Sequence, residues 1–144
     1  MKRFAVLLCL LPFTFTVFSQ TPTKKTSPDE IVRGFYAWYL HRLAKNDSNP
    51  LKNRQVSLHY LTSQFLNRVP RLSRERDADI IICSQDVDET WESNFKVNPG
   101  TINGKSSTSS VQLEGKKIPE VVKMNVTLKL TNSGWRIDGV DCAQ

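Results

Sequence analysis

Hydrophobic residues recur with a helical period in the first half of the chain. Residues 27–30 predict a helix start: Ser27 is the N-cap, Pro28 takes the first helical position and Glu30 closes a capping box. The predicted helix runs to about Lys45. It has a wide apolar face with four aromatic residues, which indicates packing against a sheet. This face comprises Ile31, Val32, Phe35, Tyr36, Trp38, Tyr39, Leu40 and Leu43.

Two further helices are expected before the middle of the chain. Apolar residues at helical spacing predict one from about Asn53 to Arg68, which Val69 and Pro70 should end. Ser73 could cap a third, short helix through Ile82, although the isoleucines at 80–82 would equally suit a strand.

After Asp86 the hydrophobic period changes from 3.6 to 2, which is typical of half-buried strands. Strands are predicted over about 91–97, 106–113, 122–130 and 135–140, the second with a polar, serine-rich outer face. Turn signals separate them at 99–100, 103–104 and 132–134. Helices followed by an antiparallel meander predict an α+β fold, in which N-terminal helices pack on a curved sheet of about four strands.

The N-terminus has the pattern of a secretion signal. Met1–Arg3 is positively charged, and the next fifteen residues, 4–18, carry no charge. That run is shorter than the roughly twenty apolar residues that a membrane span needs. We therefore expect a signal peptide at 1–19, a flexible linker at 20–26 and one α+β domain at 27–144, exported to the periplasm or beyond. Cys9 lies inside the apolar run, so lipidation is not expected.

Export would place the remaining cysteines in an oxidising compartment, which favours a disulfide. Loss of Cys9 leaves Cys83 and Cys142, and a lone pair in an oxidising compartment is most simply a disulfide. It would close a loop of about 60 residues and stabilise the fold by on the order of 4 kcal/mol. Two buried free thiols, or one reactive thiol, are the alternatives. No CxxC spacing or paired histidine supports redox or metal chemistry.

The charge balance argues against nucleic-acid binding. Without Lys2 and Arg3, 18 of the 20 basic residues remain against 14 acidic ones, a net charge of +4. One dense basic stretch is interleaved with acidic residues, which favours a solvated face with local ion pairs. Its alternative role is to dock an anion or an acidic partner. The stretch contains Arg68, Arg71, Arg74 and Arg76.

Three short segments carry a family resemblance: FYAWYL at 35–40, CSQDVDETW at 83–91 and GWRIDGV at 134–140. They resemble the exported bacterial family known as domain of unknown function 3828, which includes YbjP-like lipoproteins. The layout also looks like the cystatin-like roll of the nuclear-transport-factor-two superfamily. The resemblance implies an envelope location but no established reaction.

Within the central motif, Gln85, Asp86 and Trp91 are candidate ligand-binding residues at the mouth of a roll cavity, with Asp88 beside them. The alternative is a turn, with Trp91 in the core.

No catalytic constellation is recognisable in the sequence. It lacks HExxH, GxSxG and Walker-type motifs, and His41 and His59 are its only histidines. Two histidines and a bridged cysteine pair undersupply a metal site, so no metal or cofactor is expected. The sequence favours an exported, non-enzymatic domain that binds a protein partner, with an immunity protein as one subclass, or a small ligand. The alternatives are a small hydrolase or isomerase using Asp86 or a histidine as base, and an accessory subunit of an envelope complex.

Overall fold

The computed structural model describes residues 26–143, in which helices precede one antiparallel sheet. The helical half contains α1 (Pro28–Ala44), the 3-10 turn η1 (Pro50–Lys52), α2 (Arg54–Tyr60) and α3 (Ser63–Arg76). The one-turn helix α4 (Trp91–Asn94) leads into β1 (Phe95–Asn103), β2 (Ser106–Leu113), β3 (Val122–Thr131) and β4 (Gly134–Cys142).

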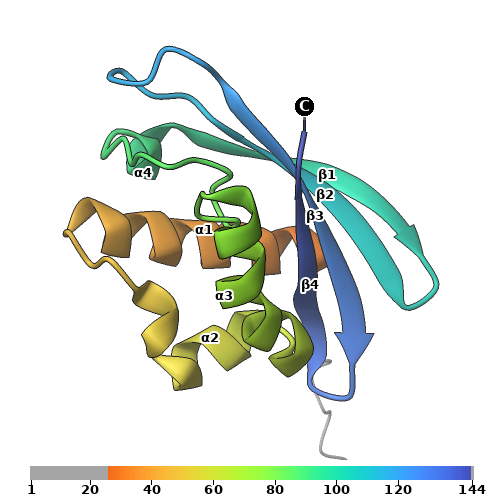
Figure 1. The fold of residues 1–144 in the computed structure, drawn as a ribbon. Coiled ribbons are helices and arrows are strands. Elements are labelled where there is room, and N and C mark those ends of the chain that lie inside the picture. The colour runs from red at the N-terminus through yellow and green to blue at the C-terminus, as the bar shows by residue number, and fades with distance from the viewer. Residues whose placement is uncertain (1–25, 144) are drawn as a thin grey trace, which may run out of the picture.

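The four strands pair in chain order, and the helices lie on one side of the curved sheet (Figure 1). The predicted α+β class and the four-stranded meander are therefore confirmed. Residues 1–19, the expected signal peptide, and all but the last residue of the expected linker lie outside the described residues. No helix between residues 26 and 143 combines the length and apolarity that a membrane span needs.

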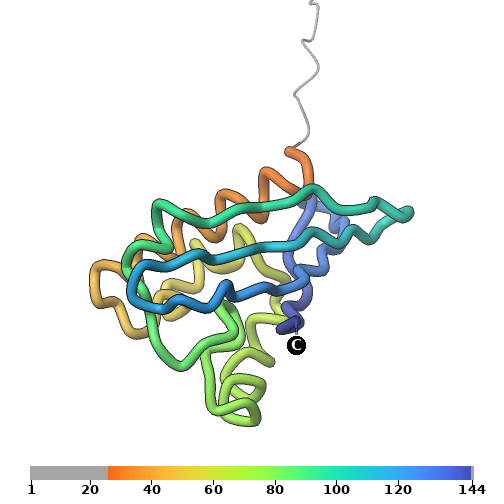
Figure 2. Tube along the Cα trace, turned by 90° about the horizontal axis from the view of Figure 1, so that it is seen from above, coloured from red at the N-terminus to blue at the C-terminus, as the bar shows by residue number. Residues whose placement is uncertain are grey.

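Helix α1 supplies the centre of the core. Its start is the predicted capping box: the Ser27 hydroxyl accepts from the Glu30 amide, and the Glu30 carboxylate accepts from the Ser27 amide at 2.7 Å. The helix contacts β1, β2 and β4, and it runs alongside the sheet in Figure 2. Burying each large apolar side chain stabilises the fold by about 1.5–3 kcal/mol. The buried residues of α1 are Pro28, Ile31, Val32, Phe35, Tyr36, Tyr39 and Leu40.

The predicted second helix is two helices, because the chain leaves the helical path to pair with β4. Leu61 is extended and forms a parallel bridge with Ile137, whose carbonyl accepts from the Thr62 amide at 2.8 Å. The Thr62 hydroxyl then caps α3 by accepting from the Phe65 amide. This turn covers the outer edge of β4 and sets the direction of α3.

Helix α3 continues through Pro70 to Arg76, so the predicted stop at Pro70 is wrong. The buried face formed by Phe65, Leu66 and Val69 holds it against the core, so tertiary packing outweighs the cost of an interior proline. The predicted third helix at 73–82 is also wrong. The three isoleucines at 80–82 are buried in a turn instead.

The first strand starts later and ends later than predicted. Trp91–Asn94 is one helical turn, and the sheet begins at Phe95. The predicted turn at Pro99 and Gly100 is instead a register shift inside β1. A Cβ on Gly100 would lie 1.1 Å from the Thr108 carbonyl oxygen of β2, so only glycine fits this close approach. In β2 the outer face is polar as expected, but Ser107 and Ser109 are buried on the inner face.

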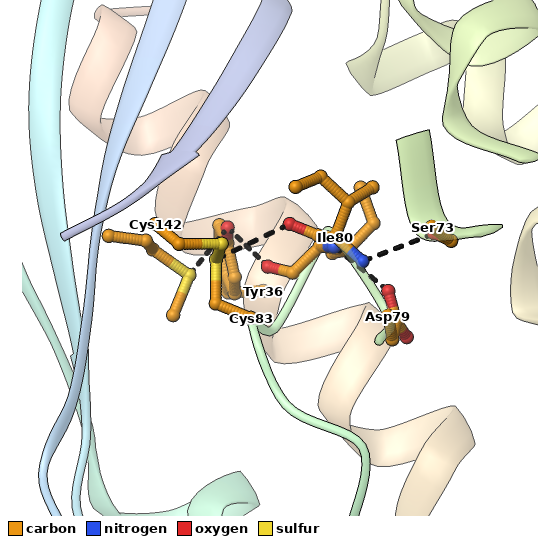
Figure 3. The surroundings of a disulfide bond; sticks show 8 residues. Tyr36, Ser73, Asp79, Ile80, Cys83 and Cys142 are labelled. Carbon is orange, nitrogen blue, oxygen red and sulfur yellow. Dashed lines mark hydrogen bonds between the residues drawn. A yellow bond between two sulfur atoms is a disulfide. The ribbon is translucent and has the colours of Figure 1, made fainter. Parts of the chain in front are cut away.

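A disulfide fastens the loop after α3 to the end of the sheet. Cys83 and Cys142 are bridged, with their Cα atoms 5.6 Å apart, as the sequence predicts. Figure 3 shows Tyr36 of α1 beside this bridge. The Tyr36 hydroxyl donates to the Ile81 carbonyl at 2.9 Å, and burial raises the Tyr36 pKa far above its usual range, so the hydroxyl stays protonated. The bridge and this hydrogen bond both fix the turn that contains the isoleucines.

Asp88 fastens the next part of the same segment. Its Oδ1 accepts from the amide and hydroxyl of Thr90, and its Oδ2 accepts from the amides of Lys117 and Ile118 at 2.6 and 3.0 Å. The residue is only 1% exposed. The Thr90 hydroxyl bond, aided by the three amides, lowers the pKa of Asp88 far below its ordinary 3.8. A carboxylate that accepts four hydrogen bonds thus joins the segment before α4 to the β2–β3 connection.

Replacing Cys142 with serine should lower the melting temperature by on the order of 10 °C, because the unfolded chain regains the entropy of a 59-residue separation. Differential scanning calorimetry of Cys142→Ser, Cys83→Ser and the double variant checks this. All three should melt alike, since each removes the same bridge. Free thiols in the non-reduced native protein, or an unchanged melting temperature, would refute the structural role of the bridge.

Replacing Asp88 with asparagine should destabilise the fold, because one acceptor oxygen becomes an NH₂ group facing N–H donors. The folded pKa of Asp88 is depressed, so its stabilisation is complete above the unfolded value of 3.8 and is lost as the pH falls toward the folded value. Urea unfolding should therefore show a difference between wild type and variant that shrinks between about pH 6 and about pH 3.

Asp86→Asn is the matched control for Asp88→Asn. Asp86 is exposed and makes no hydrogen bond within residues 26–143, so its substitution should leave unfolding unchanged. Equal effects of the two substitutions would contradict the role given to Asp88.

Candidate functional site

The three candidate ligand-binding residues do not meet around a cavity. Gln85 and Asp86 are exposed on the loop after the Cys83 turn, and the Gln85 amide donates to Asp77 at 3.3 Å. Trp91 is fully buried in the core. Its neighbour Asp88 is occupied by backbone donors, as described above. None of these residues lines either of the two depressions described below.

The two histidines have separate surroundings. His41 Nδ1 lies 2.6 Å from a Glu92 carboxylate oxygen, an exposed contact between α1 and α4. His59 packs edge-on against Tyr60 on α2. No hydrogen bond within the described part of the chain joins either histidine to the other or to Asp86. The two histidines and Asp86 therefore form no hydrogen-bonded acid–base pair with one another within residues 26–143.

All four arginines of the basic stretch lie on α3, but they have different roles. Arg68 donates to the Asp138 carbonyl at 2.8 Å and lies over the Phe65 ring. Arg71 pairs with Glu75 one turn later at 2.7 Å, a surface ion pair of small energetic value. Arg74 and Arg76 are exposed and form no ion pair within residues 26–143. The stretch is therefore part structural and part available for contacts.

A groove of about 650 Å³ lies between η1 and α3, and we call it the α3 groove. Five apolar side chains line it, contributed by η1, by the middle of α3 and by the turn after α3. Three basic side chains, Lys52, Arg54 and Arg74, line its polar part from both sides. The apolar lining comprises Leu51, Leu66, Val69, Pro70 and Ala78.

A buried tyrosine–carboxylate pair lies along the same groove. The Tyr39 hydroxyl donates to Asp79 Oδ2 at 2.7 Å, and the Ile81 amide donates to Asp79 Oδ1 at 2.8 Å. Burial raises the pKa of Asp79, although these two hydrogen bonds oppose the shift. Burial also raises the pKa of Tyr39 well above 10.0, so this phenol stays protonated. Both oxygens of Asp79 are thus already satisfied by the chain itself.

A second depression of about 530 Å³ lies at the β3–β4 turn and the start of α1. Ile31, His59, Trp135 and Arg136 are among its lining residues. Arg136 is engaged internally, because it donates to the carbonyls of Leu58 and Trp135. Residues 26–143 contain no group of three or more histidine, cysteine, aspartate or glutamate side chains that could hold a metal ion.

Of the three basic side chains in the groove, only Arg74 belongs to the basic stretch that the sequence singles out. Lys52 and Arg54 follow Pro50 in a segment that carries no motif, and their relation to α3 arises only from the fold. The interior Pro70 was read as a helix stop, although it is one of the residues that line the groove.

Comparison with known proteins gives a fold relationship but no family. No family model matches the chain, and no curated protein matches it. A chain in the crystal structure of the type VI native effector–immunity complex Tae3–Tai3 from Ralstonia pickettii is similar in structure, with a TM-score of 0.68. The match has 20% identity and covers 83% of this chain and 98% of that one.

A protein of unknown function from Bacteroides thetaiotaomicron is similar as well. Its TM-score is 0.61 at 21% identity, over 77% of this chain and 85% of that chain. This α+β fold is therefore shared, nearly end to end, with a component of an effector–immunity complex and with a second bacterial protein.

Proposed function

We propose that this protein is an exported, non-enzymatic binding protein of the immunity type, which binds and blocks a secreted effector enzyme in the cell envelope. The observation that carries the proposal is the near-complete structural match to a chain of an effector–immunity complex. The match includes 98% of that chain, so it extends over the whole domain rather than one shared motif.

Two further features support this function. The Cys83–Cys142 disulfide suits an oxidising compartment, where the N-terminal signal pattern would send the chain. The candidate acid–base groups Asp86, His41 and His59 are dispersed, which suits a binding protein better than the alternative hydrolase or isomerase. A surface that binds protein needs shape and charge but no catalytic geometry.

The test is to isolate and reconstitute the complex. Tagged protein beginning at residue 20 is incubated with envelope and secreted fractions of the organism that encodes it, and bound proteins are identified by mass spectrometry. Both proteins are then purified, mixed and resolved by size-exclusion chromatography. We expect a stoichiometric complex with a secreted enzyme, and loss of that enzyme's activity at equimolar ratio. A complex that leaves the enzyme fully active, or the absence of any stoichiometric complex, would contradict the proposal.

A further inference from the structure

We propose that the α3 groove is the docking site for an acidic segment of the protein partner, one that places an apolar side chain on the groove floor between flanking carboxylates. This inference rests on the proposed function and names the surface and the chemistry of recognition.

The groove lining has a surplus of one positive charge, because three basic side chains stand against two carboxylates, Asp77 and Asp79. Its lining contains Lys52, Arg54 and Arg74, and none of the three forms an ion pair within residues 26–143. Arg54 donates only to the neutral Asn67 amide oxygen, at 3.3 Å. Such side chains favour a partner that brings carboxylates to them.

The two carboxylates in the groove are already engaged by the chain. Asp79 accepts from Tyr39 and from the Ile81 amide, and Asp77 accepts from the Gln85 amide. Lys52 and Arg74 form no ion pair within residues 26–143, and Arg54 donates only to a neutral amide oxygen, so their charges are open to a partner. With the lining at a net +1, an acidic segment is the electrostatic complement of the groove.

The floor favours an apolar side chain over a simple anion. Leu51, Leu66 and Val69 are largely buried, at 8%, 6% and 8% exposure, yet each contributes to the groove surface together with Pro70. A volume of about 650 Å³ accommodates one or two large side chains of a partner. An apolar floor beside basic side chains matches a segment in which leucine or phenylalanine is flanked by aspartate or glutamate.

The interior proline of α3 points to a polypeptide as the occupant. Pro70 has no N–H, so the Leu66 carbonyl lacks its usual helical donor. Leu66 and Pro70 both line the groove. A peptide that brought a backbone N–H to this carbonyl would satisfy it, whereas a lipid phosphodiester would not, because it only accepts hydrogen bonds.

The first test uses a fluorescein-labelled peptide with the sequence Gly-Asp-Glu-Leu-Phe-Glu-Asp-Gly, followed by fluorescence polarisation. One control peptide carries lysine at every acidic position, and another carries serine in place of leucine and phenylalanine. We expect binding of the acidic apolar peptide and at least about tenfold weaker binding of both controls. Binding should also weaken as salt is raised, because screening acts on exposed charges.

Variants locate the site. Lys52→Glu and Arg74→Glu lie on opposite walls of the groove and should each weaken binding about tenfold. Arg76→Glu makes the same charge change on α3 outside the groove lining, and it should leave binding within about twofold of wild type. Circular dichroism melting verifies that each variant folds. Arg74→Gln and Lys52→Gln replace any that does not, with the same direction of effect.

The Pro70→Ala variant distinguishes a role of Pro70 in helix stability from a role in peptide binding. Alanine restores the N–H for the Leu66 carbonyl, so α3 should become more stable while peptide binding weakens several-fold. A purely structural role for Pro70 would change the melting temperature and leave binding unchanged, which would count against the inference.

Three results would overturn the inference: no binding of the acidic apolar peptide, an equal loss for Arg74→Glu and Arg76→Glu, or binding only to vesicles of phosphatidylglycerol and phosphatidylcholine. Binding of the intact partner protein to the groove variants distinguishes failure of the groove proposal from failure of the proposed function. A partner that binds Lys52→Glu and Arg74→Glu as tightly as wild type would overturn the groove while the immunity role stands. Groove-dependent peptide binding without any effector enzyme would support the groove and refute the immunity role.

Discussion

The packing of α1 against the inner face of the sheet is the interaction on which the rest of the structure depends. Phe35 and Tyr36 are fully buried, and α1 contacts all four strands, since Tyr36 also bonds Met124 of β3. Tyr36 also reaches across to the Ile81 carbonyl, so one side chain joins the helix, the sheet and the turn after α3. An element that supplies both apolar area and a satisfied polar contact fixes a single register for its neighbours.

The packing of α1 also positions the α3 groove, whose lining residues come from distant parts of the chain. The disulfide, the Tyr36 hydroxyl and Asp88 hold residues 77–91, a segment with little regular structure of its own. Because this segment is fixed, Asp77 and Asp79 lie at one end of the α3 groove. Constraints in the interior thereby define the shape of a binding surface without contributing catalytic groups to it.

The sequence predicted the elements whose signals are local. The capping box at Ser27, the alternation in β2 and β3 and the lone cysteine pair each depend on neighbouring residues or on simple counting, and the structure contains them. The break at Leu61 and the interior Pro70 could not be predicted, because contacts with Ile137 and the core decide them. The groove was missed for the same reason, since η1 and α3 meet only in the folded chain. Whether residues 85, 86 and 91 take part in ligand binding stays a prediction.

Taken together, the two proposals have this domain bind its partner through the α3 groove. Hydrogen–deuterium exchange of the protein, free and in its reconstituted complex, tests that claim most directly, because it reports every amide at once. Docking in the α3 groove predicts new protection of the amides in residues 51–54, 66–69, 71–74 and 77–79, with little change on the outer face of the sheet. Protection confined to the outer sheet face or to the β1–β2 hairpin would contradict it.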